Sequence, residues 1–109
     1  MNKQRIIYTD RSNTLLQSYF RDINKYKPLE ITELNNLIVK AQEGDMKARE
    51  KVVNSNLKFV VTIAKQFQNR GIPLMDLIGS GTEGLIKAVE KFDPSRNVKF
   101  LSYAVWWIK

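Results

Sequence analysis

Apolar side chains recur at helical spacing along most of this sequence, and that periodicity constrains the fold more than any other feature. Between residues 52 and 67 an apolar residue returns every three or four positions, which places these side chains on one side of a helix. No alternating pattern of the kind that marks a half-buried strand competes with it. The sequence therefore predicts an all-α chain folded as a compact multi-helix bundle.

The length of 109 residues suggests a single domain. Residues 1–11 are basic and show little periodicity, so we expect a flexible basic arm there and a helical domain over residues 12–109. The first helix of that domain is predicted to begin at Ser12 or Asn13 and to end before Pro28.

Capping residues divide the next part of the chain. Thr32 is expected to cap a second helix that stops at Gly44. Asp45 is expected to cap a long third stretch. The Asn54-Ser55-Asn56 cluster within it is a weak point, either a kink or a second cap, because such side chains compete for backbone hydrogen bonds.

The C-terminal part of the chain combines conflicting signals. Residues 73–91 have helical periodicity, but the segment Gly79–Gly84 in their middle contains three glycines, each costing a helix roughly 1 kcal/mol. The flanking periodicity favours a helix that contains the glycines. Residues 93–97 are typical of a turn, and a last helix begins near Phe100.

Charge and composition limit the function classes. The chain carries a net charge of +7 and has neither Cys nor His. A basic excess of this size favours a polyanionic partner, although a basic protein without such a partner has the same composition. Thiol and imidazole chemistry and nearly all zinc sites are excluded. The apolar runs are too short to span a membrane, so we expect a cytoplasmic, nucleoid-associated protein.

The last helix has the most specific side-chain pattern. Tyr103, Trp106 and Trp107 lie at i, i+3 and i+4, so their rings project from one side. Cationic and aromatic residues flank them in the chain: Arg96, Lys99, Phe100 and Lys109. Unstacked bases could stack on such rings while the cations hold phosphates. The pattern alone leaves open that the three rings pack in the core.

No catalytic or cofactor site is predicted. The glycines of residues 79–84 lack the Lys-Ser or Lys-Thr of a phosphate-binding loop and do not follow a strand. Among the nearby carboxylates, Asp76, Glu83, Glu90 and Asp93, none pairs with another at a spacing that suits acid–base chemistry or a metal ion. We therefore expect neither an enzyme nor a cofactor.

Several ordered motifs nevertheless resemble one known family. They begin with Asn56-Leu57-Lys58-Phe59-Val60-Val61 and continue through Asp76-Leu77-Ile78 and Gly84-Leu85-Ile86-Lys87-Ala88. They end with Lys99-Phe100-Leu101-Ser102-Tyr103-Ala104-Val105-Trp106-Trp107-Ile108-Lys109. This series closely resembles the second region of primary-type bacterial sigma factors, and residues 16–44 resemble the helical region before it.

The resemblance implies a promoter-melting module with the helical bundle of that region. The position of Tyr103 would stack on a flipped adenine in the non-template strand of the minus-ten element, and Trp106 and Trp107 would brace the duplex edge. Arg96, Lys99, Phe100 and Lys109 would surround the strand, and Asn56 would line a second base pocket.

Core RNA polymerase would be the protein partner, through the clamp helices of its largest subunit, with an anti-sigma regulator as a further candidate. The expected docking residues are Asp76, Ser80, Thr82, Glu83, Leu85 and Ile86.

The chain departs from the family pattern in three places, and the first and the third leave room for an alternative, a polymerase-docking or regulator-docking protein that does not melt promoters. Gly79-Ser80-Gly81-Thr82 stands where Gln-Glu-Gly-Asn is usual. Val98 replaces an aromatic residue. The sequence ends at Lys109, before the remainder of the recognition helix, which suits either a fragment or a naturally short protein.

Overall fold

The computed structural model describes residues 3–68, 70–96 and 98–108, with side chains described from residue 14 onward. Within these residues the regular structure is entirely helical, which confirms the predicted all-α class. The helices are α1 (Lys3–Asn24), α2 (Ile31–Gln42), α3 (Met46–Ser55), α4 (Leu57–Lys65), α5 (Leu74–Lys91) and α6 (Phe100–Ile108). None of them is both long and apolar enough to cross a membrane.

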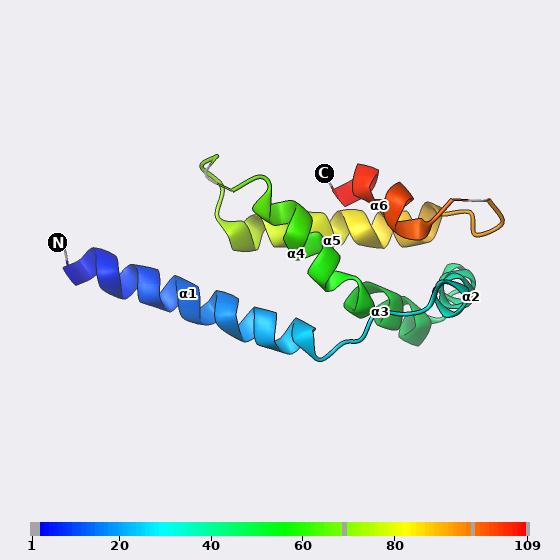
Figure 1. The fold of residues 1–109 in the computed structure, drawn as a ribbon, viewed down its shortest axis with the longest axis horizontal. Helices are drawn as coiled ribbons and strands as arrows, with labels where there is room; N and C mark the ends of the chain where they lie inside the picture. The colour runs from blue at the N-terminus through cyan, green and yellow to red at the C-terminus, as the bar shows by residue number, and fades with distance from the viewer. Residues whose placement is uncertain (1–2, 69, 97, 109) are drawn as a thin grey trace.

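Helix α5 is the centre of the bundle. It packs against α2, α3, α4 and α6, and Figure 1 shows α6 lying along it while α1 extends along the side of α4. The molecule measures 56 × 25 × 21 Å, because α1 continues past the other helices (Figure 1). The residues of α5 and α6 are therefore held in fixed positions by packing against the other helices.

The core is a continuous cluster of aliphatic side chains with two phenylalanines. Its largest fully buried side chains come from α2, α3, α4 and α5: Ile38, Val52, Val60, Leu85 and Val89. The rings of Phe92 and Phe100 meet edge to face at 5.3 Å between centroids, a favoured aromatic geometry. They join the end of α5 to the start of α6.

Helix ends follow the predicted signals only in part. The Asp45 carboxylate accepts hydrogen bonds from the backbone N–H groups of Lys47 and Ala48, as expected of an N-cap. Gly44 has φ +103°, which a glycine adopts without strain. The prediction that Thr32 caps α2 is wrong, because α2 begins at Ile31 and Glu30 is its N-cap residue.

The weak point predicted at Asn54-Ser55-Asn56 is where α3 and α4 separate. The Asn56 side chain donates from Nδ2 to the carbonyl oxygen of Val52 at 2.8 Å. A side chain that takes a backbone carbonyl in this way competes with the helical ladder. The chain therefore bends at Asn56 and directs α4 across α5.

Gln42 at the end of α2 ties that helix to the end of α5. Its Nε2 donates to the carbonyl oxygens of Val89 at 2.9 Å and Phe92 at 2.7 Å. Carbonyls in the last turn of a helix have no helical partner, so an amide that supplies two donors stabilises this end. The contact fixes the point where the chain leaves α5 toward the turn at residues 93–97.

The N-terminal helix starts earlier than the sequence predicts. Helix α1 begins at Lys3 rather than at Ser12 or Asn13, and residues 3–11 contain no Gly or Pro that would break it. Residues 1 and 2 lie outside the described residues. The division between an arm at residues 1–11 and a domain at 12–109 stays a prediction.

Candidate nucleic-acid interface

Helix α6 buries one stripe and exposes another, and this separates its aromatic residues. Phe100, Ala104 and Ile108 recur every fourth residue and are buried. Tyr103 and Trp107 stand beside that stripe and are half-buried. Trp106 lies farthest from it and is 82% exposed. The three rings thus form a graded surface, with Tyr103 and Trp107 supported by the bundle and Trp106 open to solvent.

The close crossing of α5 and α6 depends on two glycines. A Cβ at Gly84 would lie 2.7 Å from the carbonyl carbon of Trp107, and a Cβ at Gly81 would lie 3.2 Å from Cγ2 of Ile108. Residues without a side chain let the two backbones approach. The glycine-containing segment lies within α5, which confirms the prediction that it is helical. The two glycines also explain how α6, which carries Tyr103, packs so closely on α5.

A pocket of about 310 Å³ opens beside Tyr103, at the junction of α5, the following turn and α6. The Tyr103 ring forms one wall and lies 5.4 Å, centroid to centroid, from the ring of Phe92. Its other lining residues are Lys91, Asp93, Arg96 and Val98. The pocket therefore combines an aromatic wall with cations at its rim, the chemistry that suits one base and its phosphates.

The turn at the pocket is held by Asp93. Its Oδ1 accepts hydrogen bonds from the backbone N–H and the hydroxyl of Ser95, at 3.0 and 2.6 Å, and its Oδ2 lies 3.8 Å from Nε of Arg96. The hydrogen bonds from Ser95, with a smaller contribution from Arg96, lower the pKa of the Asp93 carboxyl. The ionised carboxylate thus orders the segment that carries Arg96.

Lys91 is a functional candidate that the sequence reasoning missed. It lines the Tyr103 pocket, and its Nζ lies 6.0 Å from the ring centroid of Trp107, at the outer limit of a cation–π contact. Its position directly before the turn could have pointed to it, since the residues on both sides of a turn share one end of the fold. Lys91 links the two aromatic positions.

The remaining predicted DNA-binding positions divide into exposed and buried ones. Lys99 is exposed, as a phosphate contact requires. Phe100 is only 2% exposed and packs on Phe92, so its ring lies in the core here, and its place around the strand stays a prediction. Lys109 lies outside the described residues.

Asn56, for which a second base pocket is predicted, lies at the junction of α3 and α4, and its contact with a base stays a prediction. Asn56 is 8% exposed, and its amide nitrogen is occupied by Val52 and by Ser55, whose Oγ lies at 3.3 Å. Its role in this structure is to join α3 to α4. The structure does not bring Asn56 into the pocket of Tyr103.

The predicted docking residues on α5 divide in the same way. Asp76, Ser80 and Glu83 are exposed, and Gly79 lies open between them, with no atom within 4 Å of an added Cβ. They form a solvent-facing stripe of α5, which we call the α5 outer stripe.

Three docking positions lie elsewhere on α5. Leu85 is fully buried and faces the core, so it is not part of the exposed stripe, and its contact with a partner stays a prediction. Ile86 is half-buried. The half-buried Thr82 donates to the carbonyl oxygen of Ile78 at 2.8 Å and meets Tyr19 of α1. Burial raises the pKa of the Tyr19 phenol, and the hydrogen bond with Thr82 opposes that rise.

Acidic side chains do not gather into a metal site. Among the residues whose side chains are described, no group of three or more carboxylates is close enough to hold an ion.

Comparison with known proteins gives one family and several relatives. The profile of the family described as Sigma-70 region 2 matches residues 52–109. The chain is 42% identical over 99 residues to RNA polymerase sigma factor RpoS of Coxiella burnetii, covering 91% of this chain and 28% of that protein. It is 39% identical over 94 residues to RNA polymerase sigma-C factor of Myxococcus xanthus, covering 86% and 32%. The chain thus spans about a third of the length of these relatives.

Proposed function

The chain belongs to the Sigma-70 region 2 family, and from this premise we propose that it binds core RNA polymerase and opens promoter DNA at the minus-ten element. Sigma factors act in transcription initiation and are not enzymes, in keeping with the names of its relatives. The proposal assigns base capture to the pocket beside Tyr103 and polymerase docking to the α5 outer stripe.

One observation carries the proposal: Tyr103 forms the wall of a pocket whose rim holds Lys91 and Arg96. Extruding a base from a duplex costs a few kcal/mol. Stacking on an aromatic ring returns roughly 1–3 kcal/mol per base, and the rim cations attract the adjoining phosphates. The half-buried Tyr103 ring packs on Phe92 and is already ordered without DNA. Binding therefore costs little side-chain entropy.

The two tryptophans suit the edge of the remaining duplex. Trp106 projects into solvent with 82% of its surface exposed, which is unusual for so large an apolar ring. Trp107 is half-buried and lies under Lys91. In the proposed mechanism Trp106 and Trp107 stack against the last base pair while Tyr103 takes the base that has left it.

Retention of a single-stranded minus-ten oligonucleotide by the chain together with bacterial core polymerase tests the proposal. We expect retention only when chain and polymerase are both present, and a weaker complex with a scrambled oligonucleotide. Tyr103→Ala should weaken binding by roughly 1–3 kcal/mol, whereas Tyr103→Phe, which keeps the ring, should bind nearly as the natural chain does. Equal loss with both variants would contradict stacking at Tyr103.

Phosphate contact is tested by salt dependence. Lys99→Ala should make the log–log slope of DNA affinity against salt shallower by about one unit, because one counterion-releasing contact is lost. Lys40→Ala is the matched control, since Lys40 is an exposed lysine on α2, and its slope should equal that of the natural chain. Identical slopes for both variants would place Lys99 outside the interface.

A second candidate function is docking without promoter melting. Two observations favour it: Gly79 and Ser80 leave the α5 outer stripe without an amide or a carboxylate at these positions, and Val98 lines the base pocket without an aromatic ring. A chain that competes with a housekeeping sigma factor for core polymerase, yet retains no minus-ten oligonucleotide, would have this function instead.

A further inference from the structure

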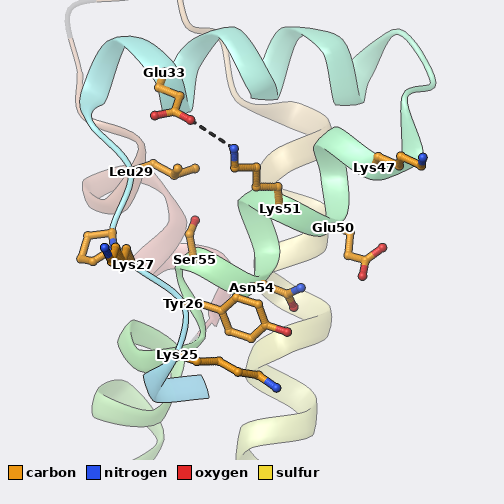
Figure 2. A pocket seen from close by; sticks show the side chains of 11 residues that line it. Lys25, Tyr26, Lys27, Leu29, Glu33, Lys47, Glu50, Lys51, Asn54 and Ser55 are labelled. Carbon is orange, nitrogen blue, oxygen red and sulfur yellow. Dashed lines mark hydrogen bonds and ion pairs between the residues drawn. The ribbon is translucent and has the colours of Figure 1, made fainter. Parts of the chain in front are cut away.

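A second pocket lies apart from the Tyr103 site. It measures about 640 Å³ and lies between residues 25–29, which link α1 to α2, and helices α2 and α3. Figure 2 shows the linker on one side, α2 above and α3 on the other side. Pockets of about 300–1,000 Å³ are the usual size for small organic ligands. It shares no lining residue with the pocket of Tyr103.

An aromatic ring and an amide meet in this pocket. Tyr26 and Asn54 are both half-buried and both line it, and Figure 2 shows the Tyr26 ring beside the Asn54 side chain. The Asn54 side chain makes no hydrogen bond with any residue whose side chain is described. A side-chain amide offers two donors and an acceptor, the combination that pairs with the edge of a base. A ring beside it offers a stacking surface.

Charged side chains surround the pair, namely four lysines and the carboxylates of Glu33 and Glu50. Lys25, Lys27 and Lys47 are exposed lining residues and point to different sides of the pocket in Figure 2. Lys51 is held in an ion pair by Glu33, with 3.3 Å between Nζ and Oε1. Lys25 also lies 5.9 Å from the centroid of the Tyr26 ring. Lys25 and Lys27, the residues before and after Tyr26 in the sequence, are therefore exposed cations that a phosphate could contact.

We propose that this pocket binds a phosphorylated nucleoside, with its base between Tyr26 and Asn54 and its phosphates at Lys25 and Lys27. An acidic peptide would use the lysines but would leave the amide and the ring without a role, so the combination favours a nucleotide. The ligand can be a free nucleotide or one unit of a strand, since both present the same base and phosphate. The proposal does not depend on promoter melting at Tyr103.

Calorimetric titration of the whole chain with ATP, GTP, CTP and UTP tests the proposal. We expect saturable binding at one site, with a preference among the bases that reflects the Asn54 amide. Tyr26→Ala and Asn54→Ala should each weaken binding by about tenfold, within the range found for loss of one stacking or base-edge contact. Tyr26→Phe keeps the ring and should bind nearly as the natural chain does.

Matched controls separate this site from the rest of the molecule. Asn36→Ala removes an exposed asparagine of α2 that does not line the pocket and should leave nucleotide binding unchanged. Tyr103→Ala should also leave it unchanged, so failure of either proposal can be recognised separately. Circular dichroism melting of each variant shows whether a loss of binding reflects unfolding, and Asn54→Ala covers the case in which Tyr26→Ala does not fold.

Three results would overturn the proposal: no saturable binding of any nucleotide, equally tight binding of inorganic tripolyphosphate, or displacement of nucleotide by polyglutamate at equal charge. The last two would show a site for charge alone. In the Tyr103→Ala background, a single-stranded oligodeoxynucleotide that displaces the nucleotide identifies a strand as the source. Failure to displace it, with nucleotide binding intact, identifies a free nucleotide.

Discussion

Glycine lies on both faces of α5, but its effect on stability differs between the two faces. On the inner face, Gly84 lies under the backbone of Trp107, where no side chain fits. On the outer face, Gly79 lies in the α5 outer stripe with open space around it. Each glycine costs the helix roughly 1 kcal/mol relative to alanine. Only on the inner face is this cost offset, because the missing side chain lets α6 pack closely against α5.

The comparison teaches where α5 tolerates change. The inner face holds α6, and through it Tyr103, so substitutions there should change folding and the site together. The outer face touches nothing else in the described structure at Gly79, so changes there should act on the helix itself or on a partner. The following predictions test this division.

The largest effect is expected for Gly84→Ala. Its Cβ would collide with the carbonyl oxygen of Trp107 and lie 3.1 Å from Cα of Ile108, and backbone atoms cannot rotate away. We expect the free energy of unfolding to fall by about 3 kcal/mol, the upper end of the range for overpacking, together with weaker oligonucleotide binding. Urea unfolding followed by tryptophan fluorescence measures the change. An unchanged midpoint would mean that α5 and α6 are farther apart than described.

Gly81→Ala should have an intermediate effect. Its Cβ would lie 2.8 Å from Cγ1 of Val60 and 3.2 Å from Cγ2 of Ile108. These are methyl groups that can shift, unlike a backbone carbonyl, and alanine improves the helix propensity of α5. We expect a net loss of roughly 1 kcal/mol, measured in the same urea series. A loss larger than that of Gly84→Ala would contradict the ranking of the two contacts.

Gly79→Ala should have the opposite sign. Nothing lies within 4 Å of its added Cβ, so only the helix propensity changes, and we expect a gain of about 0.5–1 kcal/mol in stability. Thermal melting beside Gly84→Ala provides the contrast within one helix. Destabilisation by Gly79→Ala would show that the outer stripe is not free in the folded chain.

The smallest effect concerns the turn that joins α5 to α6. The pKa of the Asp93 carboxyl is lowered in the folded chain, so its stabilising contribution is present above the unfolded pKa of about 3.9 and is lost as pH falls below it. The difference in melting temperature between the natural chain and Asp93→Asn should therefore shrink from pH 5 to pH 2. A constant difference would show that ionisation of Asp93 does not hold the turn.

Local signals in the sequence predicted the helices well where a cap or a breaker acts within its own turn. Asp45 caps α3 and Gly44 ends the preceding turn, as expected. The prediction failed at Thr32, because α2 begins at Ile31 and its N-cap residue, Glu30, makes no side-chain capping hydrogen bond that a local sequence pattern could have indicated. The predicted start of the first helix at Ser12 or Asn13 is also wrong, because α1 begins at Lys3.

The candidate site shows a different limit. Tyr103, Trp106 and Trp107 were identified from spacing and resemblance, but their pattern could not tell which ring the bundle would cover. Phe100 and Leu85 were assigned to partners and are core residues. Lys91, a wall of the Tyr103 pocket, was overlooked because its neighbours in space come from the turn and from α6.

The sequence by itself determined that the chain is helical and basic and that its last helical segment carries an aromatic cluster, since helical hydrogen bonds and side-chain periodicity act within a few residues. Only the tertiary structure decided how close α6 lies to α5, which aromatic rings remain open, and that Tyr26 meets Asn54 in a second pocket. Burial of a helix face is set by the helices that cover it, and those contacts join residues distant in the chain.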